Sequence, residues 1–224
     1  GWTDPVPHVY ADGVPWEHFY TSATVPCPTA PHLFLSFPKR FVPNRKKIAE
    51  HEGPGVSDAV FMSSRDGIHW DRPFLEAWVR PGPDPKNWTD RNNMTANGIV
   101  VTGEGEWSLY ISEHYRHEDH RIRRLTVRKQ GFASMHGDAK GGTFTTKPLV
   151  VSGTKLHLNY ATSAAGSVGI EVLDETGKVA AELKELYGDE FEASALDLSA
   201  HKGRTVTLRV SLKDADLYAL RFAE

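Results

Sequence analysis

The chain has 224 residues, of which 39% are hydrophobic and 25% are charged, the composition of an ordinary globular protein. Acidic residues (29) slightly outnumber basic ones (26), so no basic face that would bind nucleic acid is expected. No apolar run approaches the ~20 residues that a membrane helix needs, so a membrane is not an expected partner either. The single cysteine, Cys27, excludes an internal disulfide framework and leaves the cellular compartment open.

Short strands dominate the elements predicted before residue 141. Five segments, each followed by Pro, Gly or polar turn residues, are typical of strands: residues 32–37, 58–63, 98–102, 107–112 and 121–128. Residues 103–106 (G-E-G-E) join two of them in a hairpin pattern. The best helix candidate, residues 44–52, is highly charged and has too few apolar residues to pack firmly. We expect it to form an exposed loop, with one helical turn at most.

An internal repeat indicates the architecture of this first part. The sequence W-D-R-P at residues 70–73 echoes W-T-D-P at residues 2–5, and residues 127–133 echo residues 64–70. The spacing gives two units of roughly 65 residues, each with the order strand, loop, strand, turn, strand. Such a unit matches a four-stranded propeller blade, whose apolar faces are covered by neighbouring blades. The alternative is a chance similarity, because short Trp and Pro matches are common.

The pattern changes after residue 140. Six segments indicate strands: residues 143–151, 155–161, 167–173, 191–198, 204–212 and 217–222. In residues 156–160 and 205–210, apolar and polar residues alternate, which predicts one buried and one solvated face for each strand. Residues 174–177 (D-E-T-G) predict a hairpin turn. The sequence therefore predicts an all-β protein, with a partial propeller of about two blades at residues 1–140 and a jelly-roll-like β-sandwich at residues 141–224.

The segment S-R-D-G-I-H-W at residues 64–70 is similar to the S-x-D-G-x-x-W blade turn of five-bladed β-propeller glycosidases, the arabinanase/xylosidase and fructosidase grouping. It is one residue shorter than the sialidase Asp-box. Other stretches resemble a group of bacterial glycosidase-like proteins: residues 20–23, 30–33, 40–43, 57–67, 87–93, 108–115, 142–149 and 212–218. The resemblance covers nearly the whole chain. It implies a glycoside hydrolase-like protein that acts on an oligo- or polysaccharide.

The length of the chain does not fit a complete propeller of this kind. Five blades take roughly 300 residues at about 60 per blade, whereas the sandwich pattern begins at residue 141. Two blades cannot close a ring, and their open edges would pair readily with other strands. We therefore expect this chain to be the C-terminal part of a longer propeller, or to be completed by another chain or by copies of itself. The alternative is a short protein that ends its blades differently.

Glu113 and Asp58 are the candidate catalytic residues. Glycoside hydrolysis needs two carboxyl groups that flank the scissile bond. Glu113 ends the predicted strand at residues 107–112, where partial burial beside aromatic residues would favour the protonated form of a general acid. The equally good alternative is a surface salt bridge with Arg121 or Arg123. Asp58 precedes an apolar strand, and we rank turn capping above catalysis for it. In the resembled enzymes an essential carboxylate comes from the first blade, which is not expected here.

A dense polar loop is the candidate sugar-binding segment. Asp90, Arg91 and Asn92 offer directional hydrogen bonds to hydroxyl or carboxylate groups, and Trp88 can stack on a sugar face. The alternative is a solvated loop tied by Asx turns. Further residues that could line the funnel of a propeller are His114, Arg65, His32 and Arg40.

The histidines of residues 114–120 suggest a metal site only weakly. His114, His117 and His120 lie near acidic residues, but spacings of three fit neither a strand face nor a helix face well. We prefer a solvated hairpin loop and expect no metal or other cofactor. Asp66 is expected to hold its own turn through backbone hydrogen bonds rather than to act as an acid.

Three functions remain as alternatives. The first is a polysaccharide-processing glycosidase, with carbohydrate as its partner and a secreted or periplasmic location. The second is a non-catalytic carbohydrate-binding module. The third is a self-associating scaffold that recruits copies of the chain through its open sheet edges.

Overall fold

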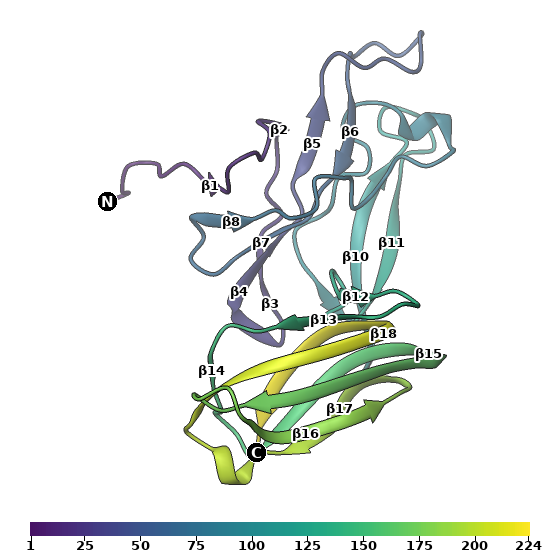
Figure 1. Cartoon of the computed structure of the whole chain (residues 1–224). Helices are drawn as coiled ribbons and strands as arrows, with labels where there is room; N and C mark the ends of the chain where they lie inside the picture. Colours follow the sequence, from purple (N-terminus) through teal and green to yellow (C-terminus); the bar gives the residue numbers. More distant parts are fainter. The chain divides into compact units, whose positions relative to one another are not determined.

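The computed structural model describes residues 1–224, and the fold is all-β (Figure 1). The helical segments are two short 3-10 helices, η1 (Pro85–Asn87) and η2 (Ser199–His201). The chain divides into two compact units, Gly1–Val127 and Arg128–Glu224. The predicted boundary after residue 140 lies within the second of these units. None of the helices is long or apolar enough to cross a membrane.

The first unit contains three open sheets. The five-stranded sheet has the order β1-β8-β7-β4-β3 and is built from β1 (Val9–Tyr10), β3 (Val25–Cys27), β4 (Ala30–Ser36), β7 (Met62–Ser64) and β8 (His69–Asp71). The second sheet has the order β2-β5-β6 and contains β2 (His18–Phe19), β5 (Lys39–Val42) and β6 (Val56–Ala59). The third has the order β11-β10-β9 and contains β9 (Val100–Val101), β10 (Glu106–Glu113) and β11 (Arg121–Arg128). None of the sheets is closed.

The turn between β7 and β8 forms as the sequence predicts. Asp66 accepts hydrogen bonds from the backbone N–H groups of Ile68 and His69, at 2.8 and 2.7 Å. Gly67 has a φ of 77°, which glycine adopts without strain, and its carbonyl accepts from Trp70 Nε1 at 3.1 Å. The structural role expected for Asp66 is confirmed. The repeat stays a prediction, because Trp70 is buried here, whereas its counterpart Trp2 is fully exposed.

The period of two along β10 determines which of its side chains are buried. Trp107, Leu109 and Ile111 all face the core, with 0–3% of their surface exposed. Glu113 continues the same series and is therefore buried, at 1% exposure. Ala59 and Val79 pack with Ile111 in one apolar cluster of this unit. The carboxylate of Glu113 is thus buried in the core at the end of β10.

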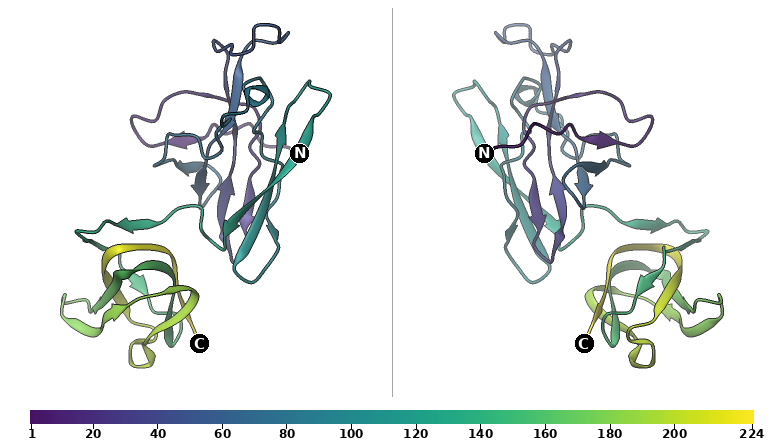
Figure 2. Two further views of the ribbon diagram at one scale, coloured as in Figure 1. Left: turned by 90° about the vertical axis from the view of Figure 1, so that its right-hand side faces the viewer. Right: turned by 90° about the vertical axis from the view of Figure 1, so that its left-hand side faces the viewer.

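The second unit is organised around two strands of 19 residues, β15 (Lys155–Leu173) and β18 (Thr205–Ala223), which pair along their length. β15 also pairs with β16 (Val179–Leu186) and β17 (Asp189–Asp197). β18 also pairs with β12 (Met135–Gly137), β13 (Gly142–Thr145) and β14 (Leu149–Val150). Figure 2 shows both long strands curving strongly along their length. The predicted strands 155–161 and 167–173 are thus one bent strand, as are 204–212 and 217–222, which corrects the sequence-based division.

The bend has a local cause. The pairing of β15 with β18 shifts register between Thr162 and Ser167. Opposite this point Asp214 has a φ of 45°, and a Cβ added to Gly166 would lie 2.2 Å from the carbonyl oxygen of Asp214. The strands can therefore approach there only because residue 166 has no side chain. The irregularity also shifts the parity of buried residues in β18, from Leu212 to Ala215 and Leu217.

The core of the second unit follows the predicted alternation. Leu156, Leu158 and Tyr160 are buried with Val206, Leu208 and Val210, all at 0–2% exposure, and Val168, Ile170 and Val172 extend the same cluster. The turn at residues 174–177 forms as predicted, with Asp174 Oδ1 accepting from the backbone N–H groups of Thr176 and Lys178. One face of each long strand is therefore apolar, as expected for a packed β-layer.

Candidate functional site

The alternation of side chains along β5 places two different charged groups on opposite faces. Lys39 and Phe41 share one face and both contact the ring of Tyr20, at centroid distances of 4.5 and 5.4 Å. Arg40 projects to the other face, where it meets Asp58 of the neighbouring strand β6. Lys39 and Arg40, on opposite faces of β5, thus belong to two separate polar clusters.

The Arg40 face carries a network of four charges: Glu17, Arg40, Asp58 and Arg72. Arg40 binds Asp58 bidentately, from Nε to Oδ1 at 2.9 Å and from Nη2 to Oδ2 at 2.7 Å. It also donates to Glu17 Oε1 at 2.9 Å. The second oxygen of Glu17 pairs with Arg72, whose side chain is fully buried against the ring of Phe19. Asp58 is therefore an ion-pair partner of Arg40. Its predicted turn-capping and catalytic roles stay predictions.

Glu113 forms ion pairs with Arg121 and Arg123, the alternative to its predicted role as an acid. Its Oε2 accepts from Arg121 Nε at 2.9 Å, and its Oε1 lies 3.0 Å from Arg123 Nε. Asn87 Nδ2 donates to Oε1 at 3.3 Å. A carboxylate that accepts from two guanidinium groups and an amide is a poor proton donor. The catalytic assignment of Glu113 stays a prediction.

Three buried asparagines connect the loop at residues 84–93 to the turn that follows β10. Asn87 Oδ1 accepts from the backbone N–H of His114 at 3.3 Å, and Asn92 Oδ1 accepts from that of Tyr115 at 2.7 Å. Asn93 Nδ2 donates to the carbonyl oxygens of Ser57 and Asn87. Asn92 was predicted to bind sugar, but it is 0% exposed. Buried asparagine side chains thus tie the polar loop to the turn, while Arg91 of the same loop stays half exposed.

Four non-glycine residues with left-handed backbones gather in these two segments. The φ angles are 60° at Arg91, 58° at Asn93, 56° at His114 and 67° at Arg116. Each such residue costs about 1–2 kcal/mol relative to right-handed backbone. Strain of this kind collects at sites where side-chain direction matters for function. The two segments therefore hold Arg91 and Arg116 in a backbone conformation that an unconstrained loop would disfavour.

We call the group Lys39, Asp90, Arg91, Tyr115 and Arg116 the Tyr115 cluster. Arg91 Nη1 donates to the Tyr115 hydroxyl at 2.6 Å. The guanidinium carbons of Arg91 and Arg116 lie 5.2 and 5.8 Å from the centre of the Tyr115 ring. Asp90 lies 3.7 Å from Arg91 Nε and 3.6 Å from Arg116 Nη2. The hydrogen bond to Tyr115 and the nearby charge of Asp90 hold the pKa of Arg91 above its usual value.

Lys39 completes the cluster, although no pattern in the sequence marks it as a site residue. Only 6% of its surface is exposed, and its Nζ lies over the Tyr20 ring without an ion pair. Burial and the nearby charge of Arg91 lower its pKa, while Asp90 and Tyr115 oppose that shift. Nothing in the local sequence distinguishes Lys39 from Arg40, because the direction of each side chain depends on which face of β5 is covered.

The histidines form a structural group beside this cluster. Nδ1 of His114 lies 2.9 Å from Asp119 Oδ2, and its Nε2 lies 2.8 Å from Asp84 Oδ2. His51 Nε2 lies 3.0 Å from Asp90 Oδ1, and its ring stacks at 6.2 Å on that of His117. The expected hairpin loop is present, but His114 is buried in it rather than solvated. No group of three or more His, Cys, Asp or Glu side chains is arranged to hold a metal ion.

A cavity of about 450 Å³ adjoins the Tyr115 cluster: Arg116 of the cluster lines it, as does His51, which contacts Asp90. Its other lining residues are Ile48, Glu50, Glu52 and His117. The charged stretch at residues 44–52 forms the exposed loop that the sequence predicts. This loop and the turn after β10 therefore meet around one hollow of the first unit.

The remaining predicted residues lie apart from the Tyr115 cluster. Trp88 is partly exposed, but its Nε1 donates to the Gly82 carbonyl at 2.7 Å. His32 and Arg65 are exposed, on β4 and on the β7–β8 turn, and contact none of the cluster residues. Of the predicted sugar-binding residues, the structure brings Asp90 and Arg91 together at one surface, with Asn92 and His114 buried beneath them.

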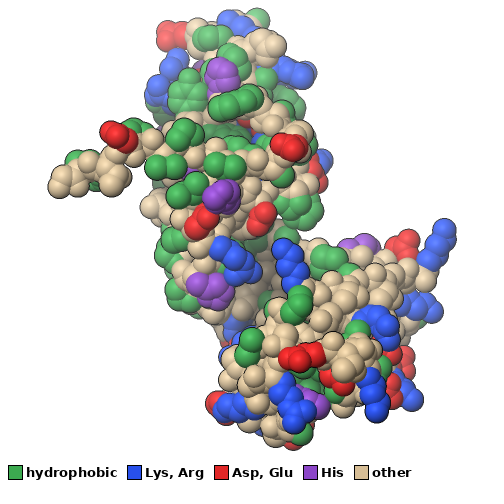
Figure 3. Space-filling view, turned by 60° about the vertical axis from the view of Figure 1, so that its left-hand side comes forward, with side chains coloured by type: hydrophobic (Ala, Val, Ile, Leu, Met, Phe, Trp, Pro, Cys, Tyr) green, Lys and Arg blue, Asp and Glu red, His purple; other side chains and the backbone are tan.

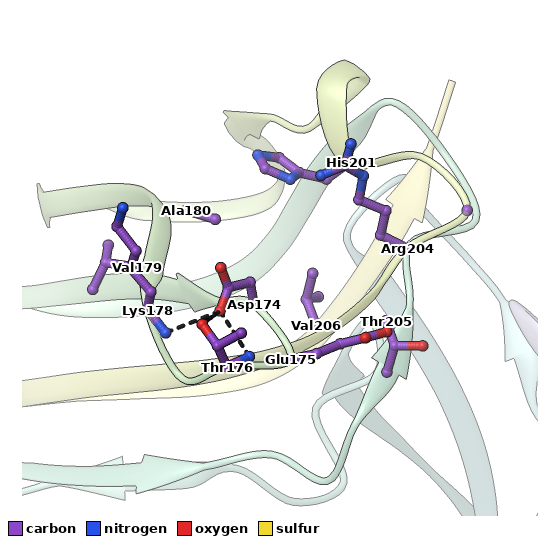
Figure 4. Close-up of a pocket in the computed structure, with 11 residues that line it drawn as sticks. Asp174, Glu175, Thr176, Lys178, Val179, Ala180, His201, Arg204, Thr205 and Val206 are labelled. Atoms are coloured by element: carbon purple, nitrogen blue, oxygen red, sulfur yellow. Dashed lines mark hydrogen bonds between the residues drawn. The ribbon is translucent and has the colours of Figure 1, made fainter.

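The second unit has a cavity of about 730 Å³ between the turn at residues 174–178 and residues 201–206 (Figure 4). Figure 4 shows the Asp174 carboxylate hydrogen-bonded within its own turn. These hydrogen bonds, led by the one from the Thr176 hydroxyl, lower the pKa of Asp174. His201 and Arg204 line the opposite side. Of the two carboxylates that line the cavity, Asp174 and Glu175, that of Asp174 is occupied by its own turn.

On the face shown in Figure 3, acidic and basic side chains are interspersed, with hydrophobic residues between them. This agrees with the formal net charge of -3. No protein-family model, curated protein or solved structure matches the chain.

Proposed function

We propose that this protein binds an oligo- or polysaccharide, and that the Tyr115 cluster of the first unit is its binding site. The observation that carries the proposal is the arrangement around Tyr115, where two arginines with left-handed backbones flank one tyrosine ring. Saccharides are held by directional donors beside an aromatic surface, and donors fixed by buried hydrogen bonds bind at a lower entropic cost. The resemblance to glycosidase-like proteins supports a saccharide as the ligand.

The contacts of the two predicted acids favour binding over hydrolysis. A glycosidase needs one carboxyl group that gives up a proton and another that activates water or attacks. Asp58 is held bidentately by Arg40, and Glu113 by two arginines and an asparagine. Both carboxylates are thus engaged in ion pairs. We therefore propose a recognition role for this chain within a glycosidase-like architecture.

Glycoside hydrolysis is the second candidate function, favoured by one observation. Glu113 is a buried carboxylate at the end of a core strand, two residues before Tyr115. A conformational change that released it from Arg121 and Arg123 would place an acid next to the proposed binding site. Release of reducing sugar by the wild-type protein, lost in Glu113→Gln with the fold intact, would establish this function in place of simple binding.

We also propose that the first unit is a partial propeller and the second a β-sandwich. The blade-type turn at residues 64–70 forms with the expected hydrogen bonds, and the first unit consists of several open sheets. In the second unit the long strands bury one face each. Another chain, or further copies of this one, would complete the ring.

The binding proposal is tested by affinity electrophoresis of the full chain in gels that contain arabinan, xylan, levan, polygalacturonate or alginate. We expect retardation by at least one polymer, and its loss in Arg91→Ala. Arg65→Ala is the matched control, because Arg65 is an exposed arginine of the same unit that contacts none of the cluster residues. Retardation that Arg65→Ala removes and Arg91→Ala leaves intact would place the site at the β7–β8 turn instead.

A further inference from the structure

The charges of the Tyr115 cluster do not balance. Three cationic side chains, Lys39, Arg91 and Arg116, act on one carboxylate, Asp90. Asp90 is further occupied by His51, whose Nε2 lies 3.0 Å from Oδ1. The cluster therefore carries two positive charges more than its acid compensates.

Lys39 is the least compensated of these cations. A lysine is almost never this deeply buried unless a carboxylate pairs with it. Its Nζ has neither an ion pair nor a side-chain hydrogen bond, and the nearest stabilising group is the face of the Tyr20 ring at 4.5 Å. A cation–π contact returns about 1 kcal/mol, which offsets only part of the cost of burying an ammonium group. The fold thus keeps a largely buried cation that has no ion pair of its own.

The surroundings of Lys39 are suited to a sugar ring as well as to an anion. Tyr20 is 63% exposed, so most of its ring is accessible, and its edge is fixed by Phe41. Phe41 is in turn held by Gly55, where any side chain would collide with the ring. Arg91 is half exposed and can turn a donor toward solvent while it retains the bond to Tyr115. An aromatic face and two or three cationic donors are thus available together.

From this excess charge we infer that the ligand is an acidic saccharide, whose carboxylate or sulfate group binds at Lys39, Arg91 and Arg116. The inference rests on the proposed function and adds the chemical class of the sugar. A nucleic-acid phosphate is the less suitable anion, because the formal net charge is -3 and a phosphate backbone requires an extended basic stripe. Glu50 and Glu52 line the adjoining cavity without an ion pair of their own, and they would repel an anion that approached from that side.

The test compares acidic polymers with their own neutral derivatives. Polygalacturonate and alginate are each set against their carboxyl-reduced forms, and chondroitin sulfate against its desulfated form, in titrations of the full chain at constant ionic strength. We expect at least one acidic polymer to bind about tenfold more tightly than its neutral derivative. Lys39→Met should abolish that preference by weakening the binding of the acidic form about tenfold. Lys39→Arg should retain most of it, and Lys46→Met, an exposed control, should change nothing.

The outcomes separate the two proposals. Equal binding of acidic and neutral forms by the wild-type protein would overturn the acidic class and leave saccharide binding in place. If no polymer of either kind binds, the saccharide function fails, and with it this inference. A preference for acid that survives in Lys39→Met, with the variant shown to be folded by its thermal transition, would overturn the role of Lys39.

Discussion

Arg91 donates a hydrogen bond to the Tyr115 hydroxyl at 2.6 Å, although the two residues belong to different loops and Arg91 has a left-handed backbone. The bond joins the segment at residues 84–93 to the turn after β10, and buried asparagines hold both segments beneath it. The relationship explains why an exposed arginine can be fixed in one direction. It is the basis of the binding site proposed for the first unit.

Arg91→Gly should separate binding from stability. Glycine adopts a φ of 60° without strain, so we expect the unfolding free energy of the first unit to change by no more than about 1 kcal/mol. Saccharide binding should fall by tenfold or more, because the guanidinium group is lost. All six tryptophans lie in residues 1–127, so urea unfolding followed by tryptophan fluorescence reports on the first unit alone. A loss of stability well above 1 kcal/mol would show that Arg91 is structural.

Glu113→Gln should destabilise the first unit. Loss of the carboxylate leaves Arg121 and Arg123 without their common partner and weakens a buried network. Breaking a fully buried pair costs about 3–5 kcal/mol. Since both guanidinium groups are about half exposed, we expect about 2 kcal/mol in tryptophan-monitored urea unfolding. Glu118→Gln, on an exposed residue of the same loop, is the control. Equal stability of wild type and Glu113→Gln would mean that the ion pairs contribute nothing.

Arg72→Met tests the network on the other face of β5. The Arg72 side chain is fully buried beside Glu17, so its removal leaves a carboxylate with Arg40 as its remaining partner. We expect a loss of about 2–4 kcal/mol by the same fluorescence measurement. The double variant Arg72→Met with Glu17→Gln should recover part of that loss, because the unpaired acid is then gone as well. Additive losses in the double variant would contradict the pairing.

The turn after β10 predicts an acid-sensitive first unit. Hydrogen bonds from Lys86 and His114 lower the pKa of Asp119, and one from His114 lowers that of Asp84. Both carboxyls therefore bind protons more readily in the unfolded chain, with a value near 3.8, than in the folded one. The stability that the ionised carboxylates contribute to the folded state is fully present above about pH 4. It is lost as the pH falls toward their lowered pKa in the folded protein. The urea concentration at the unfolding midpoint should decrease as the pH is lowered below 4. In Asp119→Asn this decrease should be smaller. An identical pH slope in that variant would contradict the assignment.

Gly166→Ala should affect the second unit selectively. A methyl group at residue 166 would lie 2.2 Å from the Asp214 carbonyl oxygen and force the two long strands apart. Overpacking of this kind costs about 1–3 kcal/mol. Circular dichroism should show an earlier unfolding transition, whereas the tryptophan signal, which arises from the first unit, should be unchanged. Simultaneous shifts in both signals would mean that the units do not unfold separately.

Local chemistry made some features of the fold predictable. The period of two predicted the buried residues of β15 and β18, and Asp66-Gly67 and Asp174 to Gly177 predicted their turns. The continuity of the long strands was not predictable. Residues 163–166 resemble a turn by composition, but Gly166 accommodates a bend that only the partner strand β18 imposes. Here tertiary pairing overrides the local signal.

The candidate site was predictable only in part. The polar composition of residues 87–93 marked the loop, and it contains both the scaffold asparagines and Arg91. The sequence does not show which of these side chains are buried, because Asn92 and Arg91 are adjacent and equally polar. The burial of Glu113 could have been inferred from its place in the series Trp107, Leu109 and Ile111. Lys39 could not, since its exposure depends on loops that lie far away in sequence.

The most direct test of the account is hydrogen–deuterium exchange of the full chain with and without a polysaccharide that retards it in gels. We predict slower exchange in peptides that contain residues 37–41, 87–93 and 113–117, with no change in peptides of the second unit. Protection confined to residues 174–206, or to the β7–β8 turn, would contradict the proposal that the Tyr115 cluster binds the saccharide.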